Sequence, residues 1–550
     1  MHSLDIPERW RRFRNRELSP SDNTSRLSTD SRSQARNSQI SGLTISYDPW
    51  EPVVLSLDGG GIRGLSELFI LHKIMQRIQE MIDKEGDNPI SRAFSNHPGA
   101  RSAFSRQPKL LPCYFFDYMV GTSTGGLIAV MLGRLRMSVD DSIMEYWILG
   151  NDIFRPRLYR YFRLHGAENL EKAINHVTQK HCGSHPQGKS CHGASELLRQ
   201  YDYAEYGDIC FREHPERQNF TCKVALVSQR KQYQSQVTHL FRSYNHSERF
   251  ENNPREYNPK MLGRSNTKIW EASRATSAAP YYFPSITIGT NEFIDGGAGN
   301  NNPSNIAWNE ALWMANPLDP LRGKVAALVS LGCGEKEQRG LFGSLWNPRF
   351  YTNFIKYAKG GVTNTTAADN ETRGLAEQSG SDYFRFSVGR AKSGPMENGL
   401  AGVKLGDCKR EPKKNVGKGS QEPAQRQGFS SHIDPEKHPA RPQWYAELLK
   451  EATPQEADRK KGDFKPDKYI YTSYDTIFDG TAAYCASGED GRGVSEEIDR
   501  CAVMLLRRAR DRQSNDPERW KCFVSHPSPH HELYLSSSIR PKRRDHESYA

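Results

Sequence analysis

Three short motifs in this chain carry residue types that could perform ester chemistry. Residues 121–125 read Gly-Thr-Ser-Thr-Gly, which fits the Gly-x-Ser-x-Gly pattern around a serine nucleophile, here Ser123. Residues 58–64 read DGGGIRG, and residues 295–297 read Asp-Gly-Gly. A serine hydroxyl needs a base to take its proton, and its attack on an ester creates an oxyanion that needs hydrogen-bond donors. The three motifs could supply the nucleophile, the base and the donors.

The surroundings of Ser123 favour the nucleophile. The apolar run 114–120 before the motif predicts a strand, and the run 127–135 after it predicts an apolar helix. Gly121 and Gly125 would let the chain turn sharply between the two. Such a turn holds the serine in an exposed, strained position at a helix N-terminus, where the dipole favours a developing negative charge.

Asp295 is the candidate base. It ends a predicted strand, and Gly296 and Gly297 predict a tight turn directly after it. A partly desolvated carboxylate there could take the proton of Ser123 directly, because desolvation raises its pKa towards the working range. The alternative is a conventional histidine base, as in α/β-hydrolases. After Asp295 the chain offers the following histidines, none of which ends a predicted strand: His432, His438, His526, His530 and His531.

The glycine run in DGGGIRG predicts an anion site. Gly59, Gly60 and Gly61 could present successive backbone N–H groups to an oxyanion, and Arg63 could add charge or brace the loop. Asp58 is expected to be structural, at the strand end.

The same loop also fits a dinucleotide pattern. Gly59, Gly61 and Gly64 satisfy Gly-x-Gly-x-x-Gly between a strand and a helix. Such a site also needs an acid at the end of a second strand about 20 residues on, whereas Asp83 has that spacing but ends a helix. A nucleotide stays the minor alternative.

The elements around these motifs predict an α/β fold with a mainly parallel sheet, since strand, glycine turn and helix occur twice in succession. A buried-type strand is predicted over 53–57, and further strands over 222–228 and 324–332. Residues 291–297 are predicted to be a strand that runs into a glycine turn. A helix follows the first strand, because Leu68, Leu71, Met75, Ile78 and Ile82 recur at helical spacing. A further helix is predicted over 271–280. A second has Asn302 as its expected N-cap, and a third, over 495–512, has Ser495 as its expected N-cap.

Composition divides the chain into five parts. Residues 1–49 are expected to be a disordered Ser/Arg-rich tail, 50–408 the catalytic domain, and 409–442 a basic Pro/Lys/Gly-rich insertion. Residues 443–513 are expected to be a helical part that packs on the catalytic domain, and 514–550 a tail. The polar stretch 84–111 predicts a loop added to the common core.

The bulk properties fit an intracellular protein at an anionic surface. The net charge is +11 over 550 residues, which favours an anionic partner, although basic tails explain much of it. No nucleic-acid-binding signature occurs, so nucleic acid is not expected. No secretory signal or apolar run of ~18 residues is found. The 10 cysteines are scattered as in a reduced protein, and Cys182, His185, Cys191 and His192 match no standard zinc spacing.

Together, DGGGIRG, GTSTG and DGG in this order resemble the patatin-like phospholipases. The segments SRATSAAPYYFP (273–284), SLGCGE (330–335), YFRFSV (383–388) and VKLGDC (403–408) resemble the same family, the later ones its calcium-independent phospholipases. The resemblance implies a three-layer α/β/α sandwich and a dyad of Ser123 and Asp295 without histidine. It also implies an oxyanion hole at Gly59, Gly60 and Gly61, with Arg63 at the family's basic position.

The implied activity is hydrolysis of glycerolipid esters of phospholipase or lysophospholipase type through an acyl-serine, without metal or other cofactor. The implied partner is a membrane or lipid-droplet surface, bound peripherally from the cytoplasm. A catalytically inactive lipid-binding protein remains the alternative from a different class.

Overall fold

The computed structural model describes fifteen parts of the chain: residues 39–40, 43–44, 50–85, 110–153, 167–181, 221–232, 236–244, 267–280, 282–315, 323–334, 365–389, 400, 410–412, 469–486 and 493–525. The chain divides into two units, residues 1–46 and residues 47–550. In the first unit, β1 (Gln39–Ile40) pairs antiparallel with β2 (Leu43–Thr44), which the expectation of a structureless tail did not include.

The second unit is built on an eight-stranded mixed sheet in the order β10-β9-β3-β4-β5-β8-β7, with β6 also paired to β5. Strands β10, β9, β3, β4 and β5 run parallel to their neighbours, whereas β6, β7 and β8 join antiparallel. The bounds are β3 Val53–Leu57, β4 Tyr118–Thr122, β5 Lys223–Lys231, β6 Gln236–Arg242, β7 Ile286–Ile288, β8 Asn291–Asp295, β9 Ala327–Gly332 and β10 Asp382–Ser387. The predicted mainly parallel α/β sheet is confirmed.

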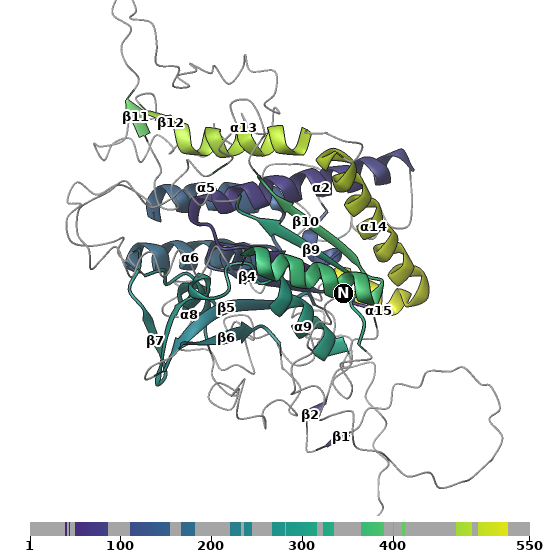
Figure 1. The fold of residues 1–550 in the computed structure, drawn as a ribbon, viewed down its shortest axis with the longest axis horizontal. Coiled ribbons are helices and arrows are strands. Elements are labelled where there is room, and N and C mark those ends of the chain that lie inside the picture. The colour runs from purple at the N-terminus through teal and green to yellow at the C-terminus, as the bar shows by residue number, and fades with distance from the viewer. Residues whose placement is uncertain are drawn as a thin grey trace, which may run out of the picture. The chain divides into compact units, whose positions relative to one another are not determined.

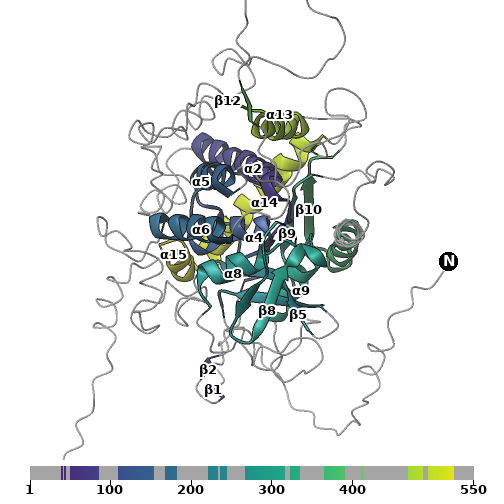
Figure 2. The same cartoon turned by 90° about the vertical axis from the view of Figure 1, so that its left-hand side faces the viewer.

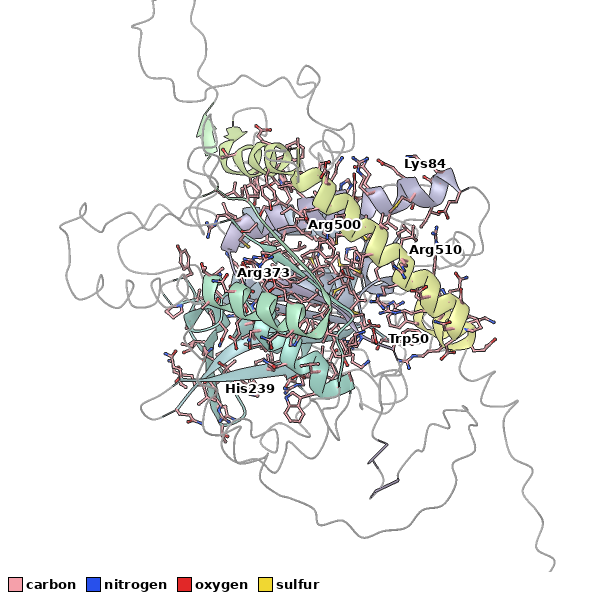
Figure 3. The ribbon with its side chains drawn as sticks, turned by 45° about the vertical axis from the view of Figure 1, so that its right-hand side comes forward. Trp50, Lys84, His239, Arg373, Arg500 and Arg510 are labelled. Carbon is pink, nitrogen blue, oxygen red and sulfur yellow. The ribbon has the colours of Figure 1, made fainter. Side chains whose placement is uncertain are left out.

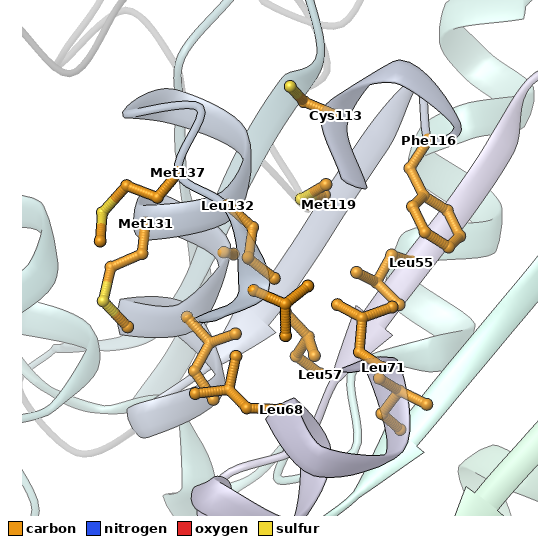
Figure 4. Packing of buried hydrophobic residues seen from close by; sticks show 14 of the residues in the cluster. Leu55, Leu57, Leu68, Leu71, Cys113, Phe116, Met119, Met131, Leu132 and Met137 are labelled. Atoms are coloured by element: carbon orange, nitrogen blue, oxygen red, sulfur yellow. The ribbon is translucent and has the colours of Figure 1, made fainter. Parts of the chain in front are cut away.

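Successive residues of the central strands enter two separate hydrophobic cores. On β3, Val53, Leu55 and Leu57 belong to one cluster, whereas Val54 belongs to the other. Because side chains of a strand alternate between its two faces, both faces of the sheet are covered. Figure 4 shows the first core, where β3 and β4 meet the helix after the glycine loop through residues such as Leu55, Leu57, Leu68, Leu71 and Met119. The sheet therefore lies between two helical layers.

The helices form these two layers, as Figures 1 and 2 show from two sides. Helix α9 and a helix over residues 365–379 supply the second core, and the other helices named here lie on the first. The bounds are α2 Leu65–Lys84, α4 Thr124–Ala129 continued by a π-helical turn Val130–Arg134, α5 Val139–Ile153, α6 Ala167–His181, α8 Ile269–Thr276, α9 Ser304–Ala315, α13 Thr472–Ala486, α14 Val494–Asn515 and α15 Pro517–Ser525.

The sequence predicts the N-cap residues of two helices, α9 and α14. Asn302 caps α9 as expected, because its side-chain Oδ1 accepts the backbone N–H of Ser304 at 3.0 Å. The predicted N-cap Ser495 is wrong, since α14 already begins at Val494 after Gly493.

The C-terminal helices are fastened to the sheet by a buried ion pair. The guanidinium of Arg512 on α14 donates to Oδ2 of Asp117, and both side chains are almost fully buried. The same oxygen accepts the N–H of Val53 at 2.7 Å, so one carboxylate joins α14 to the starts of two central strands. Figure 3 shows Trp50 beside the C-terminal end of α14. The guanidinium carbon of Arg519, on the next helix α15, lies 4.2 Å from the centre of the Trp50 ring.

The helical part also extends beyond its expected end. Helix α15 lies within the segment 514–550, for which a tail was expected. In the expected insertion, β11 (Arg410–Pro412) pairs antiparallel with β12 (Tyr469–Tyr471), and residues 413–442 lie outside the described residues. Most of the expected loop 84–111, residues 86–109, also lies outside them.

Candidate active site

Ser123 lies on a strained turn between β4 and α4. Its φ is +56° and its ψ is −124°, a conformation that residues with a side chain rarely adopt. The turn needs both flanking glycines: a Cβ on Gly121 would lie 2.3 Å from the Gly125 carbonyl oxygen, and one on Gly125 would lie 2.4 Å from that of Asp58. Close packing of three backbone segments therefore dictates the Gly-x-Ser-x-Gly spacing.

The structure brings Ser123 and Asp295 together. Oγ of Ser123 donates to Oδ2 of Asp295 at 2.6 Å. Asp295 ends β8, opposite Ser228 of β5, and β5 lies next to the strand that leads into Ser123. The second carboxylate oxygen, Oδ1, accepts the backbone N–H of Gly297 at 2.6 Å. Both carboxylate oxygens are thus held, and one of them is directed at the serine hydroxyl.

The environment of Asp295 favours its neutral form more than water does. The side chain is 1% exposed. Burial raises the pKa of Asp295 from 3.8 to about 6, while the hydrogen bonds from Ser123 and from the Gly297 N–H act in the opposite direction. A carboxylate with this pKa is ionised near neutral pH and is a stronger base than a solvated aspartate, as the proton transfer from a serine requires.

The glycine loop lies against the serine turn, but two of its three amides are already engaged. The N–H of Gly59 donates to the Asn301 carbonyl oxygen at 3.0 Å, and the N–H of Gly60 donates to Oγ1 of Thr124 at 3.1 Å. In the described part of the chain, no acceptor is found for the N–H of Gly61, whose φ is +56°. The expected row of three donors is therefore reduced to one in this structure.

These contacts fix the loop beside the nucleophile. The side-chain amide of Asn301 donates to the Gly59 carbonyl oxygen at 3.0 Å, so Asn301 and Gly59 exchange two hydrogen bonds. A Cβ on Gly59 would lie 3.2 Å from Cβ of Ser123. The same occupation of Gly59 and Gly60 argues against a phosphate cradle. Asp83, the acid expected of a dinucleotide site, lies on α2 and accepts from Gln79 at 2.7 Å.

Asp58 has the structural role that the sequence predicts. Its two carboxylate oxygens accept from the guanidinium of Arg385 on β10 at 2.9 and 2.6 Å. Its backbone N–H donates to the buried carboxyl of Glu67 at 2.8 Å. Arg63 is 7% exposed, and burial lowers its pKa, while Cys333, Tyr282 and Asp58 lie near enough to oppose this shift. Arg63 therefore places its charge inside the protein, near Cys333, Tyr282 and Asp58.

Several residues of the site could not be assigned from the sequence. Thr276 on α8 accepts the N–H of Ser123 at 2.9 Å, and Thr124 accepts the N–H of Gly60. Tyr146 on α5 donates its hydroxyl to the Gly61 carbonyl oxygen at 2.5 Å. Thr124 lies inside a recognised motif and Thr276 in the small-residue block 273–284, but their partners are set by tertiary contact. Nothing in the sequence around Tyr146 singles it out.

No histidine of the described segments bonds to Ser123 or Asp295. His239 on β6, labelled in Figure 3, lies against Phe241 and Phe293, with ring centroids 4.7 and 5.1 Å away. Burial lowers the pKa of His239 to about 3, so its ring is neutral. The five histidines of the alternative base lie outside the described residues, as do Cys182, His185, Cys191 and His192. Elsewhere, the described residues contain no metal-binding group of three or more His, Cys, Asp or Glu.

Comparisons with known proteins point to one family. Residues 55–308 match the family model of the patatin-like phospholipases. Calcium-independent phospholipase A2-gamma of Rattus norvegicus is 27% identical over 348 residues, which cover 62% of this chain and 36% of the rat protein.

Two plant proteins match as well. Phospholipase A I of Arabidopsis thaliana is 24% identical over 52% of this chain and 21% of its own length. Patatin-like protein 1 of Oryza sativa subsp. indica is 26% identical over 52% of this chain and 60% of its own length. This chain thus spans less than two thirds of each of these relatives.

Proposed function

We propose that this chain, which contains a patatin-like phospholipase domain over residues 55–308, is a serine hydrolase of glycerolipid carboxylic esters that uses a Ser123–Asp295 dyad. The observation that carries the proposal is the 2.6 Å hydrogen bond from Oγ of Ser123 to the buried carboxylate of Asp295. A hydroxyl has one proton to donate, and here it is directed at the carboxylate. This arrangement supports Asp295 over a histidine as the base.

Acylation follows from this arrangement. As Oγ of Ser123 attacks the ester carbonyl carbon, Asp295 takes the hydroxyl proton, and the carbonyl oxygen becomes an oxyanion. When the tetrahedral intermediate collapses, the bond to the alcohol oxygen breaks and Asp295 returns the proton to that oxygen. The products are the free alcohol, a lysolipid or glycerol derivative, and an acyl-serine.

Deacylation repeats the sequence with water. Asp295 takes a proton from the water that attacks the acyl-serine carbonyl, and the second tetrahedral intermediate expels Oγ of Ser123, which takes that proton back. The fatty acid leaves and the dyad is restored. The strained turn at Ser123 supports both steps, because it presents Oγ at the N-terminal end of α4, whose dipole favours the negative charge.

The oxyanion is assigned to the glycine loop, with the Gly61 N–H as the donor that this structure leaves available. One such donor is worth about 3–4 kcal/mol of transition-state stabilisation. Gly59 and Gly60 then act by placing Gly61, since their own amides bind Asn301 and Thr124.

We further propose that the substrate is a phospholipid or lysophospholipid, that calcium is not required, and that the enzyme works from the cytoplasm at a membrane or lipid-droplet surface. The names of the relatives, a calcium-independent phospholipase A2 and a phospholipase A, and the net charge of +11 support this proposal. Among the described helices, none has the length and apolar character needed to cross a bilayer.

A lipid-panel assay tests the proposal. The full chain is incubated with phospholipids, lysophospholipids, galactolipids and triacylglycerol in vesicles or micelles, with EDTA present, beside Ser123→Ala and Asp295→Asn. We expect fatty-acid release from at least one class, a loss of about 10³-fold or more in each variant, and unchanged melting of Ser123→Ala. Near-full activity of Asp295→Asn would exclude the dyad. If the wild-type chain does not hydrolyse any of the lipids and its Ser123 does not react with a fluorophosphonate, the result would instead support the inactive lipid-binding alternative.

A further inference from the structure

The peptide groups on both sides of Gly61 are held by specific hydrogen bonds. The Gly60 carbonyl oxygen accepts the backbone N–H of Arg63 at 3.2 Å. The Gly61 carbonyl oxygen accepts the hydroxyl of Tyr146 at 2.5 Å. In a trans peptide the C=O and N–H bonds point in opposite directions, so the first contact sets the direction of the Gly61 N–H. The second contact keeps Gly61 from rotating within the loop.

Gly61 needs such restraint more than most residues. Its φ of +56° lies in the left-handed region, which glycine enters at little cost and leaves as easily. Without a fixed carbonyl, the Gly61–Ile62 peptide could turn over, and the loop that carries the Gly61 N–H would lose its contact with α5. Gly61 begins the 3-10 helix Gly61–Gly64, so its carbonyl oxygen also faces the backbone of that turn. The hydroxyl of Tyr146 adds a side-chain hydrogen bond that ties the same carbonyl to α5.

Tyr146 is itself well fixed. It is 4% exposed, and its hydroxyl lies directly over Gly64, where an added Cβ would be 2.5 Å away. The next residue on α5, Trp147, stacks on Tyr474 of α13 with ring centroids 4.4 Å apart and an interplanar angle of 18°. Helix α5 is thus braced by α13, which lies outside the matched residues 55–308.

We propose that Tyr146 is a positioning residue for the oxyanion donor: its hydroxyl holds the Gly61 carbonyl and thereby keeps the Gly61 N–H aligned for the transition state. This inference rests on the proposed hydrolase function. Tyr146 does not contact the reacting atoms. Its removal should weaken transition-state binding while leaving substrate binding intact, because the oxyanion forms only during the reaction.

The test uses Tyr146→Phe, which removes the hydroxyl and keeps the ring. Tyr244→Phe is the matched control, because that buried hydroxyl also makes a short bond, to Glu310 at 2.6 Å, but in the second core. Active sites are counted by complete fluorophosphonate labelling of Ser123, and kcat and KM for a soluble short-chain ester are expressed per labelled site. Affinity for a trifluoromethyl ketone, which forms an oxyanion on the serine, is measured in parallel.

For Tyr146→Phe we expect kcat per labelled site to fall about 10- to 100-fold with KM changed less than about threefold. Ketone affinity should fall by the same factor as kcat/KM, and Tyr244→Phe should match wild type per site. A kcat per site within about twofold of wild type, a change confined to KM, or an unchanged ketone affinity would each overturn the assignment. A wild-type chain without hydrolysis or labelling would overturn the proposed function itself, and the assignment with it.

A second variant makes the test independent of the folding of Tyr146→Phe. Gly64→Ala adds a methyl group where the Tyr146 hydroxyl lies, so it should also lower kcat per site and ketone affinity. Combining it with Tyr146→Phe removes the 2.5 Å contact and leaves the ring carbon Cζ 3.2 Å from the added methyl group, so the double variant should lose less than the two single losses combined. Additive losses would show that Gly64 acts by a separate route and would contradict the proposed contact.

Discussion

The hydroxyl oxygen of Ser123 and Oδ2 of Asp295 lie 2.6 Å apart although 172 residues separate them in the chain. Their meeting depends on β5, which lies between the strands that end at the two residues. The carboxylate reaches the serine without an intervening side chain, and its burial gives it the character of a base. The pH dependence of both activity and stability should therefore report on Asp295.

Activity should rise with pH through about 6. The pKa of Asp295 is raised to about 6 by burial, and only the ionised carboxylate can accept the serine proton. The measurement is kcat/KM of the wild-type chain on a soluble ester between pH 4.5 and 8, which reports groups of the free enzyme. We expect a tenfold loss for each pH unit below the midpoint. A profile that is flat over this range, or that falls as pH rises, would rule out this base.

Stability should show the opposite dependence. The pKa of Asp295 is raised on folding, so the folded state holds the proton more tightly than the unfolded chain does. Its contribution to stability is full below about pH 4 and is lost as pH rises to about 6. A rise from 3.8 to about 6 corresponds to about 3 kcal/mol as an upper limit.

Asp295→Asn removes this titration, so its stability relative to wild type should increase between pH 4 and 7. Urea unfolding of both chains at the two pH values measures the difference. Equal changes in wild type and variant would show that Asp295 is not the group responsible.

Arg512→Met should destabilise the fold strongly. The variant leaves Asp117 buried without its guanidinium partner, and breaking a buried pair typically costs 3–5 kcal/mol. The matched control is Arg508→Met on the same helix, because Arg508 is 33% exposed and lies 3.5 Å from the 43% exposed Glu51. That change should cost less than about 1 kcal/mol. Denaturant unfolding measures the free energy of unfolding of both variants. Similar losses would show that the burial of the Arg512–Asp117 pair does not determine its contribution to stability.

Gly125→Ala should abolish activity and lower the yield of folded protein. Its methyl group would lie 2.4 Å from the Asp58 carbonyl oxygen, so the serine turn and the glycine loop would have to separate. The control is Gly374→Ala in the helix over residues 365–379, where an added Cβ meets nothing within 4 Å. That variant should be active and more stable by about 0.5–1 kcal/mol. Fluorophosphonate labelling and thermal melting distinguish the outcomes, and a labelled, active Gly125→Ala chain would contradict the packing argument.

Much of the fold was predictable because its signals are local. Apolar runs such as residues 53–57 indicate strands buried on both faces, and the 3.6-residue spacing from Leu68 to Ile82 indicates a helix with one apolar face. Boundaries were less predictable. Helix α14 begins one residue before the expected cap, and α15 lies in an expected tail, because caps and short helices depend on tertiary contacts.

In the candidate site, too, local features were predictable from the sequence and long-range contacts were not. The sequence by itself determined the residue types and their order, including the glycines at positions 121 and 125 that a sharp strand-to-helix turn around a serine predicts. The contacts that forbid a side chain at these two positions come from the packed structure. Only the tertiary structure decided which amide of the glycine loop stays available, because the acceptors for Gly59 and Gly60 come from Asn301 and Thr124. It likewise decided the raised pKa of Asp295 and the contact of Tyr146 with Gly61, since burial and long-range hydrogen bonds arise only when distant segments pack together.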